Sequence, residues 1–240
     1  VATPHHWHAL PTIHGCVAVK AGTGENPASH NIVEGKTAVA AAQKHNRMVQ
    51  VGTQIRSAKL MQEAAAYVKS GALGKVIYRK SWETDRNREV HHVSDSKPPR
   101  ELDYDLWQGP VAQRAYNETI VRRSWRWLFD YGTGDLGNDA VHRIDYCRYV
   151  MGIDQLPETI CCSGGKFFFE DEQEWPDTQI VNYEYPGKVL TCEMRLWSEP
   201  KLFGATEGAA IYGENGWMLL TNRMWKAWRR SCAGCRLYRE

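Results

Sequence analysis

The feature that most constrains the fold of this chain is a pair of alternating segments joined by a short turn. Residues 181–185 and 190–196 alternate between apolar and polar side chains, and Pro186-Gly187 lies between them. A period of two predicts a strand with one buried face, and two such strands around a turn pair predict an antiparallel hairpin. A second hairpin is predicted for 209–221, with its turn at 213–216. The C-terminal part of the chain is therefore expected to form a predominantly antiparallel sheet.

The first 54 residues follow a different pattern, in which helices alternate with short apolar strands. Asn31 with Glu34 three residues later is typical of a helix start, and the helical pattern continues to about His45. Residues 48–52 then form a short apolar run that predicts a buried strand. Alternation of this kind indicates an α/β layer with a parallel sheet, so we place a domain boundary near residue 55.

The stretch from Gly134 to Asp145 is a candidate catalytic segment. If it forms one helix, Asn138, His142 and Asp145 share a face, because positions i, i+4 and i+7 lie within roughly 60° of one another. An imidazole between an amide and a carboxylate suits proton transfer. From the pattern alone, a solvated polar face with an incidental histidine is an equally open alternative. The opposite stripe, expected to face the core, consists of Ala140, Ile144, Cys147 and Met151.

Composition excludes several classes of partner. The net charge is +2 over 240 residues, so the charge of the whole chain does not indicate binding to nucleic acid or to an anionic membrane. No apolar run approaches the ~20 residues of a membrane-spanning helix, and no signal peptide is visible. The seven cysteines are scattered, which favours a reducing compartment. We therefore expect a cytoplasmic globular protein with no membrane and no nucleic-acid partner.

Three other site motifs in the sequence are incomplete. The four early histidines have no paired cysteine or carboxylate nearby, so we predict no metal there (His5, His6, His8 and His14). Residues 22–27 contain two glycines of a phosphate loop but lack the third. The pair Cys232 and Cys235 has the C-x-x-C spacing without a second pair or a βαβ context. A serine hydrolase elbow is also absent from the sequence.

Five short motifs occur along the chain in a specific order. They are Thr3-Pro4, His8, Glu25-x-Pro27, Val51-Gly52-Thr53-Gln54, and Gly134-Asp135-Leu136-Gly137 with His142 and Asp145. In order and spacing, from residue 1 to about 228, the chain resembles the glucose–fructose oxidoreductase and inositol dehydrogenase (Gfo/Idh/MocA) family. Each motif alone is unspecific, and their joint order carries the resemblance.

The resemblance implies a fold and an activity. It implies the C-terminal part of a Rossmann-like, NAD(P)-binding parallel sheet in residues 1–54. Residues 55–240 would be an α/β domain with a large, mainly antiparallel open sheet, used for substrate binding and for assembly into a homo-oligomer. The expected reaction is hydride transfer between NAD or NADP and a sugar, cyclitol or related polyol. The chain resembles a family member truncated at both ends, without the glycine loop for the pyrophosphate, so we expect it to bind NADH weakly or not at all.

The resemblance also implies roles for individual residues. Those expected around the cofactor are Thr3, Pro4, His8, Glu25, Pro27 and Gln54, and we predict that Trp125 and Arg126, directly before the candidate segment, line the same cleft. His142 would be the acid/base on the substrate hydroxyl, and Asp145 would shape its pocket. Asn138 stands where many family members have an aspartate.

One position departs from the family pattern in a way that bears on activity. Asn26 replaces the lysine of the family's E-K-P motif, whose positive charge polarises the reacting hydroxyl. A neutral amide cannot supply that charge, and losing such a group typically costs on the order of 100-fold in rate. The alternative hypothesis is therefore a catalytically silent family member that acts as a binding or oligomerising module. A histidine-based metal hydrolase is a third and remote possibility.

Overall fold

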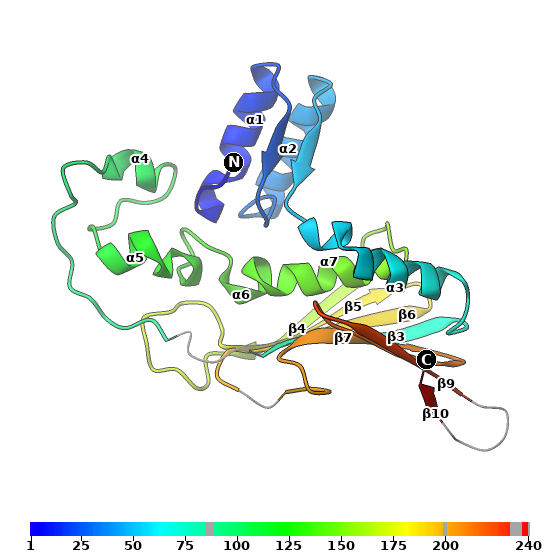
Figure 1. The fold of residues 1–240 in the computed structure, drawn as a ribbon. Helices are drawn as coiled ribbons and strands as arrows, with labels where there is room; N and C mark the ends of the chain where they lie inside the picture. Colours follow the sequence, from blue (N-terminus) through cyan, green and yellow to red (C-terminus); the bar gives the residue numbers. More distant parts are fainter. Residues whose placement is uncertain (85–88, 199–200, 231–236, 240) are drawn as a thin grey trace. The chain divides into compact units, whose positions relative to one another are not determined.

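The computed structural model describes residues 1–84, 89–198, 201–230 and 237–239, the last of these as backbone only. The chain divides into two compact units, each built from several segments of sequence. The first unit comprises residues 1–53, 89–138 and 169–176, and the second comprises 54–88, 139–168 and 177–240. Figure 1 labels the helices and strands of both units.

The first unit contains a two-stranded parallel sheet beside two helices. Strand β1 (Gly22–Gly24) pairs in parallel with β2 (Val49–Val51), so the predicted α/β alternation and the strand near residue 50 are confirmed. The predicted burial of this strand is wrong, because Val49 and Val51 are half-buried and Gln50 is exposed. The helices are α1 (Ala9–Val17), after the 3-10 turn η1 (His5–Trp7), and α2 (Ile32–Lys44). The predicted start of α2 is confirmed, because the Asn31 side chain accepts a hydrogen bond from Glu34 N at 3.0 Å.

The remainder of the first unit consists of short helices joined by loops. They are α4 (Tyr104–Gln108), α5 (Glu118–Arg122), the 3-10 turn η3 (Ser124–Trp127) and α6 (Gly134–Asn138). A separate small core forms around the buried side chains of Trp125, Leu128 and Tyr131. Gly134 opens α6 at φ +60°, where an added Cβ would lie 2.8 Å from Cγ of Trp175. Both the backbone conformation and the close ring therefore require glycine at this position.

The second unit is built on an eight-stranded sheet with the order β10-β9-β8-β7-β3-β6-β5-β4. Its strands are β3 (Val76–Thr84), β4 (Thr159–Gly165), β5 (Thr178–Tyr185), β6 (Lys188–Arg195), β7 (Glu207–Gly213), β8 (Gly216–Leu220), β9 (Trp225–Arg230) and β10 (Leu237–Arg239). Among the described strands of this sheet, only β3 and β6 pair in parallel, and both predicted hairpins are present as β5–β6 and β7–β8. The predicted fold class, with a mainly antiparallel sheet, is thus confirmed.

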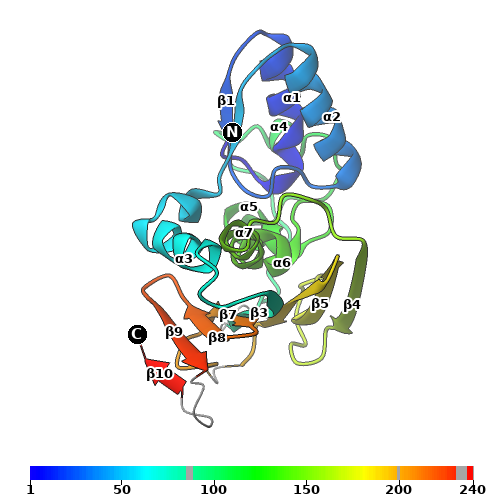
Figure 2. The same cartoon turned by 90° about the vertical axis from the view of Figure 1, so that its right-hand side faces the viewer.

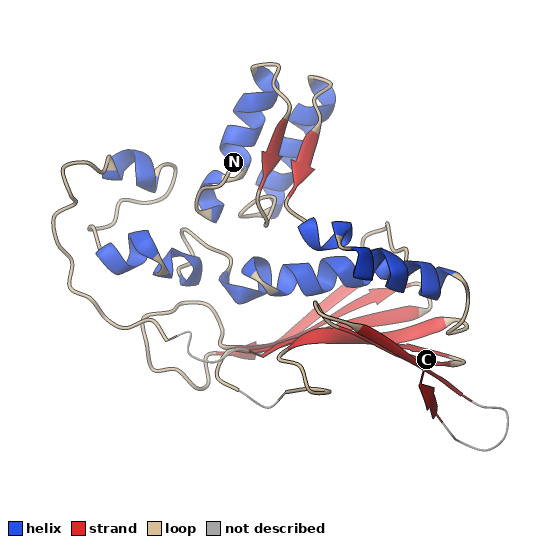
Figure 3. Ribbon diagram, viewed as in Figure 1, coloured by secondary structure: helices blue, strands red, loops and turns tan. Residues whose placement is uncertain are grey.

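Two helices of the second unit cover one face of this sheet (Figures 2 and 3). The turn η2 (Gln54–Ser57) leads into α3 (Lys59–Lys69), and α7 (Ala140–Val150) packs beside it. The core between helices and sheet includes Met61, Tyr146 and Leu220, each almost fully buried. This burial of apolar area is the main contribution to the stability of the unit.

The candidate segment departs from its prediction in two respects. It is not one helix, because Asp139 forms a turn between α6 and α7. The buried side of α7 also differs from the predicted stripe, since Ile144 and Met151 are only half-buried. The residues that face the core are Ala140, Arg143, Tyr146, Cys147 and Val150. These positions repeat every three or four residues from the new helix start, which is the spacing of one helical face.

The opposite face of the sheet carries a ladder of stacked aromatic rings. Tyr78 stacks on Tyr212 with ring centroids 5.6 Å apart, Tyr212 on Trp217 at 5.9 Å, and Trp217 on Trp228 at 4.2 Å. Because side chains alternate along β3, Tyr78 points away from the side on which Arg79 is buried under α7. We call these four residues the aromatic ladder.

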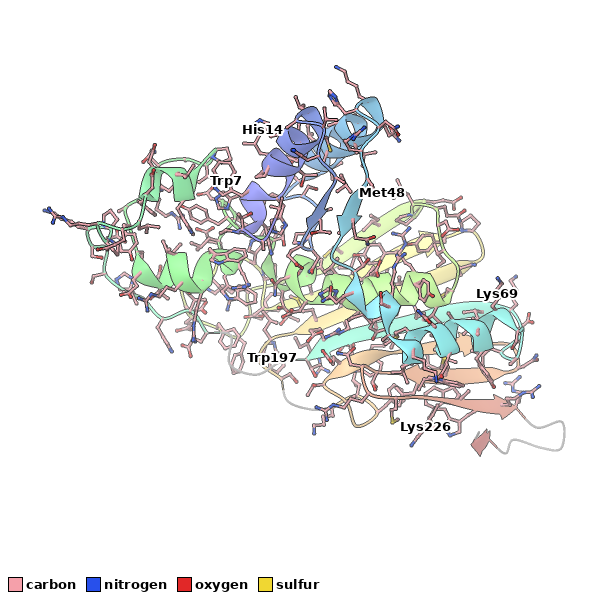
Figure 4. All side chains as sticks on the ribbon, turned by 45° about the horizontal axis from the view of Figure 1, so that its top comes forward. Trp7, His14, Met48, Lys69, Trp197 and Lys226 are labelled. Atoms are coloured by element: carbon pink, nitrogen blue, oxygen red, sulfur yellow. The ribbon has the colours of Figure 1, made fainter. Side chains whose placement is uncertain are left out.

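Several side chains lie at the outer surface of their own unit (Figure 4). His14 on α1 is exposed, and Met48 before β2 is 78% exposed. Within the described part of the chain, no helix combines the length and apolar character needed to cross a bilayer. Cys232 and Cys235 lie outside the described residues.

Candidate functional site

In the first unit, candidate residues follow the carboxyl ends of the two parallel strands. Gly24 pairs with Val51 at the end of the sheet, and Glu25-Asn26-Pro27 continues from β1. Ligands of parallel sheets bind outside this end of the strands. Glu25 is exposed there, and its backbone N–H donates to Val1 O at 3.0 Å.

His8 joins two loops at this end of the unit. Its side chain is 2% exposed, and its ring nitrogens lie 2.6 Å from Pro27 O and 2.8 Å from Thr3 O. Both contacts are with backbone carbonyls, so the imidazole connects Thr3-Pro4 to the loop after β1. The structure therefore brings together Thr3, His8 and Pro27, as the sequence motifs suggested.

A second group in the same unit is centred on Asn138, the last residue of α6. Asn26 Nδ2 donates to Asn138 O at 2.9 Å, and Arg126 Nε donates to Asn138 Oδ1 at 3.2 Å. The guanidinium of Arg126 also lies over the ring of Trp125, 4.3 Å from its centroid. Four of the predicted site residues thus form one connected network, which we call the amide network.

Buried histidines support this network. His5 Nδ1 lies 3.0 Å from the Thr133 hydroxyl, and its ring packs edge-on against Trp125 at 4.7 Å. Burial lowers the pKa of His5 to about 3, with further contributions from His8 and Arg126. Burial also lowers the pKa of His6, whose Nε2 lies 3.1 Å from Trp107 O. Both rings are neutral near neutral pH and serve as packing and hydrogen-bonding groups.

No group of three potential metal ligands occurs among the residues that the structure describes. His14 is exposed on α1, whereas the other early histidines are buried in contacts with backbone carbonyls or a hydroxyl. The early histidines therefore do not form a common set of ligands.

In the second unit, the candidate residues lie on α7 and at the start of η2. His142 is half-buried on α7, and Gln54 is exposed at the first position of η2. Asp145 receives two hydrogen bonds from Arg56, from Nη2 at 2.5 Å and from Nε at 2.8 Å. This bond to Asp145 raises the pKa of Arg56, whose guanidinium also lies 5.5 Å from the ring centroid of Tyr149.

Two charged residues of this unit were missed by the sequence reasoning. Arg56 fixes Asp145 although 89 residues separate them, and no local pattern signals that pair. Arg143 is not among the predicted site or core residues, yet its side chain is 7% exposed. It donates to Glu83 at 2.9 Å and forms a second ion pair with Glu207.

The fold therefore supports two groups of polar residues, one at the ends of parallel strands and one on a helix that covers an antiparallel sheet. In Rossmann-type folds, dinucleotides bind outside the carboxyl ends of parallel strands. The sequence profile described as "Oxidoreductase family, C-terminal alpha/beta domain" of Gfo/Idh/MocA proteins matches residues 52–185, more than half of the chain. The chain belongs to the Gfo/Idh/MocA family.

Individual relatives agree with this assignment. The chain is 26% identical over 157 residues to levoglucosan dehydrogenase from Pseudarthrobacter phenanthrenivorans, in a match that covers 63% of this chain and 32% of that protein. A solved levoglucosan dehydrogenase in complex with NADH and levoglucosan is similar in fold, with a TM-score of 0.74, 19% identity, and coverage of 99% of this chain and 58% of the other.

A further solved structure is an inositol dehydrogenase homologue from Azotobacter vinelandii in complex with NADH and myo-inositol. Its TM-score is 0.70 at 15% identity, and the match covers 100% of this chain and 55% of the other. This chain thus spans little more than half the length of these solved relatives.

Proposed function

We propose that the chain is all or part of an NAD(P)-dependent oxidoreductase that acts on a sugar, cyclitol or related polyol by hydride transfer. The observation that carries the proposal is the family match over residues 52–185, which includes the whole segment from Gly134 to Asp145. The amide network adds support, because amides and a guanidinium are suited to binding hydroxyl groups.

The residues of the first unit fit the reactive end of a dinucleotide. The carboxyl ends of β1 and β2 lie side by side, and Glu25 is exposed beyond them. The His8 ring contacts the backbone carbonyls of Thr3 and Pro27, so we assign Thr3, Pro4, His8, Glu25 and Pro27 to this end of the cofactor, together with Trp125 and Arg126 of the same unit. Gln54 is assigned to the cofactor from the family resemblance alone. When bound, NAD(P) supplies the hydride acceptor or donor.

The residues of the chain supply binding and proton transfer. We assign to His142 the exchange of a proton with the substrate hydroxyl, because an imidazole titrates near neutral pH. Asp145 is held by Arg56 through both carboxylate oxygens, so its proposed role is to fix the shape of the pocket. Asn26 and Asn138 would bind substrate hydroxyls as neutral groups.

The test is polyol-dependent reduction of NAD⁺ or NADP⁺ by the full chain, followed by the absorbance of the reduced cofactor. Because weak cofactor binding is expected, NAD⁺ is supplied at millimolar concentration across a panel of sugars and inositols. His142→Gln should abolish turnover, whereas His91→Gln, at a side chain that is 79% exposed, should leave it unchanged. Turnover that survives His142→Gln would refute the proposed role of His142, and no turnover by folded wild-type protein would refute the activity.

A role as an oligomerising module is favoured by one specific observation, the aromatic ladder. We propose that the face bearing Tyr78, Tyr212, Trp217 and Trp228 binds a second copy of the chain, since stacked aromatic residues are enriched in interfaces. Light scattering should report an oligomer that dissociates in Trp228→Lys. Ile32→Lys, at an apolar side chain that is 77% exposed on α2, is the matched control and should remain oligomeric.

A further inference from the structure

Arg79 is a buried cation in the core of the second unit. It lies on β3 beneath α7 and is 0% exposed. Its Nη1 donates to Met151 Sδ at 3.1 Å, and a thioether is a weak and uncharged acceptor. By contrast, the buried Arg143 pairs with two carboxylates. The two arginines lie under the same helix, and Arg79 is the one without an anionic partner among the described residues.

The unpaired atoms of Arg79 lie on one edge of its guanidinium. Nε and Nη2 both lack a hydrogen-bond partner within the described part of the chain. Their N–H bonds point in the same direction, and this edge is the fork with which arginine binds an anion through two hydrogen bonds. Arg56 shows the same edge filled, because its Nε and Nη2 donate to the two carboxylate oxygens of Asp145. Arg79 thus presents an anion-binding edge to its own core.

The groups around Arg79 do not neutralise its charge. Burial lowers the pKa of Arg79, and the groups that counteract this effect are thiols and phenols (Cys147, Tyr185, Tyr146 and Cys192). Burial raises the pKa of Cys147 to about 11 and that of Cys192 to about 12, so both thiols are uncharged near neutral pH. A guanidinium keeps its proton in proteins, and an isolated buried charge is strongly unfavourable. The folded state therefore gains from an anion taken up from solution.

Tyr146 provides a second donor in the same core. It lies on α7, is 0% exposed, and its hydroxyl has no hydrogen-bond partner in the described ranges. Burial raises the pKa of Tyr146 well above its usual range, so the phenol keeps its proton and can donate it in a hydrogen bond. Arg79 and Tyr146 also interact electrostatically with each other. The helix and the sheet therefore each contribute a donor without an acceptor.

We propose that the Nε–Nη2 edge of Arg79 binds a chloride ion in the core of the second unit, and that the Tyr146 hydroxyl donates to the same ion. The ion neutralises the buried guanidinium and joins β3 to α7. Full burial favours a small monovalent anion, because an ion of higher charge costs more to remove from water. Neither residue belongs to the proposed catalytic machinery, so the inference stands whether or not the chain oxidises a polyol.

The test is thermal unfolding of the full chain in mixtures of sodium chloride and sodium gluconate at constant ionic strength. An ion that binds only the folded state stabilises it in proportion to ln(1 + [ion]/Kd), so Tm should rise steadily with the logarithm of the chloride concentration above Kd. Sodium bromide should act like sodium chloride, whereas gluconate is too large for the site. A Tm that is the same in chloride and gluconate would overturn the proposal and indicate that water fills the space beside Arg79.

Substitutions locate the response. Arg79→Met removes the fork at similar volume and should abolish the difference between chloride and gluconate. Arg79→Lys keeps the charge without the fork, so the same rise in Tm should need roughly tenfold more chloride. Arg223→Met is the matched control, because this arginine is exposed in the same unit and its loss should leave the chloride response unchanged. A response that persists in Arg79→Met would overturn the assignment to Arg79.

A measurement on the wild-type protein keeps the proposal testable if Arg79→Met does not fold. Crystals grown in sodium bromide should show an anomalous scattering peak in contact with Nε and Nη2 of Arg79. Tyr146→Phe should weaken this peak, because the ion then loses one donor. A well-ordered Arg79 without a bromide peak beside it would overturn the proposal.

Discussion

Replacement of Arg143 by methionine is expected to destabilise the second unit strongly. Arg143 and Glu83 are each 7% exposed in their side chains and lie 2.9 Å apart. Glu207 forms the second ion pair of Arg143 and is 29% exposed. Methionine fills a similar volume, so the change leaves the packing of α7 on the sheet largely intact while removing the guanidinium that pairs with both carboxylates.

The size of the effect follows from what remains in the core. Glu207 can turn toward solvent, but Glu83 lies on β3 beneath α7 and stays buried. Breaking a buried ion pair by removing one partner typically costs about 3–5 kcal/mol. For a domain of this size, that corresponds to a fall in Tm of roughly 6–20 °C. Replacing Glu83 by leucine in the same protein removes the buried carboxylate that has lost its arginine and should recover most of the loss.

Urea and thermal unfolding, followed by circular dichroism, measure this effect. Arg122→Gln is the matched control, because Arg122 pairs with Glu118 on the surface at 75% and 55% exposure. Its effect should stay within about 0.5 kcal/mol. If Arg143→Met lowers the free energy of unfolding by less than about 1 kcal/mol, as the loss of a surface ion pair does, then Glu83 does not stay buried without Arg143.

Three further predictions follow from other positions. Burial lowers the pKa of His5 from 6.5 to about 3, so between these pH values only the unfolded state takes up this proton. The free energy of unfolding should therefore fall by about 1.4 kcal/mol per pH unit as the pH drops through this range. Urea titrations at several pH values measure this slope, which should be smaller in His5→Phe. Gly213→Ala would place a Cβ against the carbonyl of Leu73 and should cost about 1–3 kcal/mol in the same assay, whereas Gly15→Ala, with open space inside α1, should be neutral or stabilising. Peptide mapping after brief thiol alkylation should find Cys161 and Cys162 modified, and Cys147 and Cys192 protected. Burial raises the pKa of Cys147 to about 11 and that of Cys192 to about 12, which leaves little reactive thiolate. Early labelling of Cys192 would contradict the packing of α7.

The strands of the second unit could be predicted because their signals are local. Hairpins β5–β6 and β7–β8 need only alternation and a turn, both of which lie within about twenty residues of sequence. The start of α2 is equally local, since Asn31 and Glu34 form the cap that their spacing suggested. Each of these features depends on residues that are close together in sequence, so the pattern of one segment is sufficient to predict it.

The middle of the chain could not be predicted because its helices are short and its contacts distant. Helices α4 and α5 have five residues each, too few for a hydrophobic period to be visible. Their signals are the capping residues Asp103 and Asn117, whose side chains accept hydrogen bonds from the first turn. The loop at 169–176 joins the same unit through Glu174, whose carboxylate accepts from Phe129 N at 2.6 Å across 45 residues. No pattern within one segment of sequence predicts a hydrogen bond between residues so far apart.

The turn at Asp139 shows why the candidate site was only partly accessible from sequence. The prediction placed Asn138 and His142 on one helical face, an argument that requires continuous helix between them. The structure ends α6 at Asn138, begins α7 at Ala140, and assigns the two residues to different compact units. Helical periodicity therefore does not determine their separation. Asn138 is fixed instead by Arg126 and Asn26 within the first unit, whereas His142 is carried by α7 on the sheet of the second.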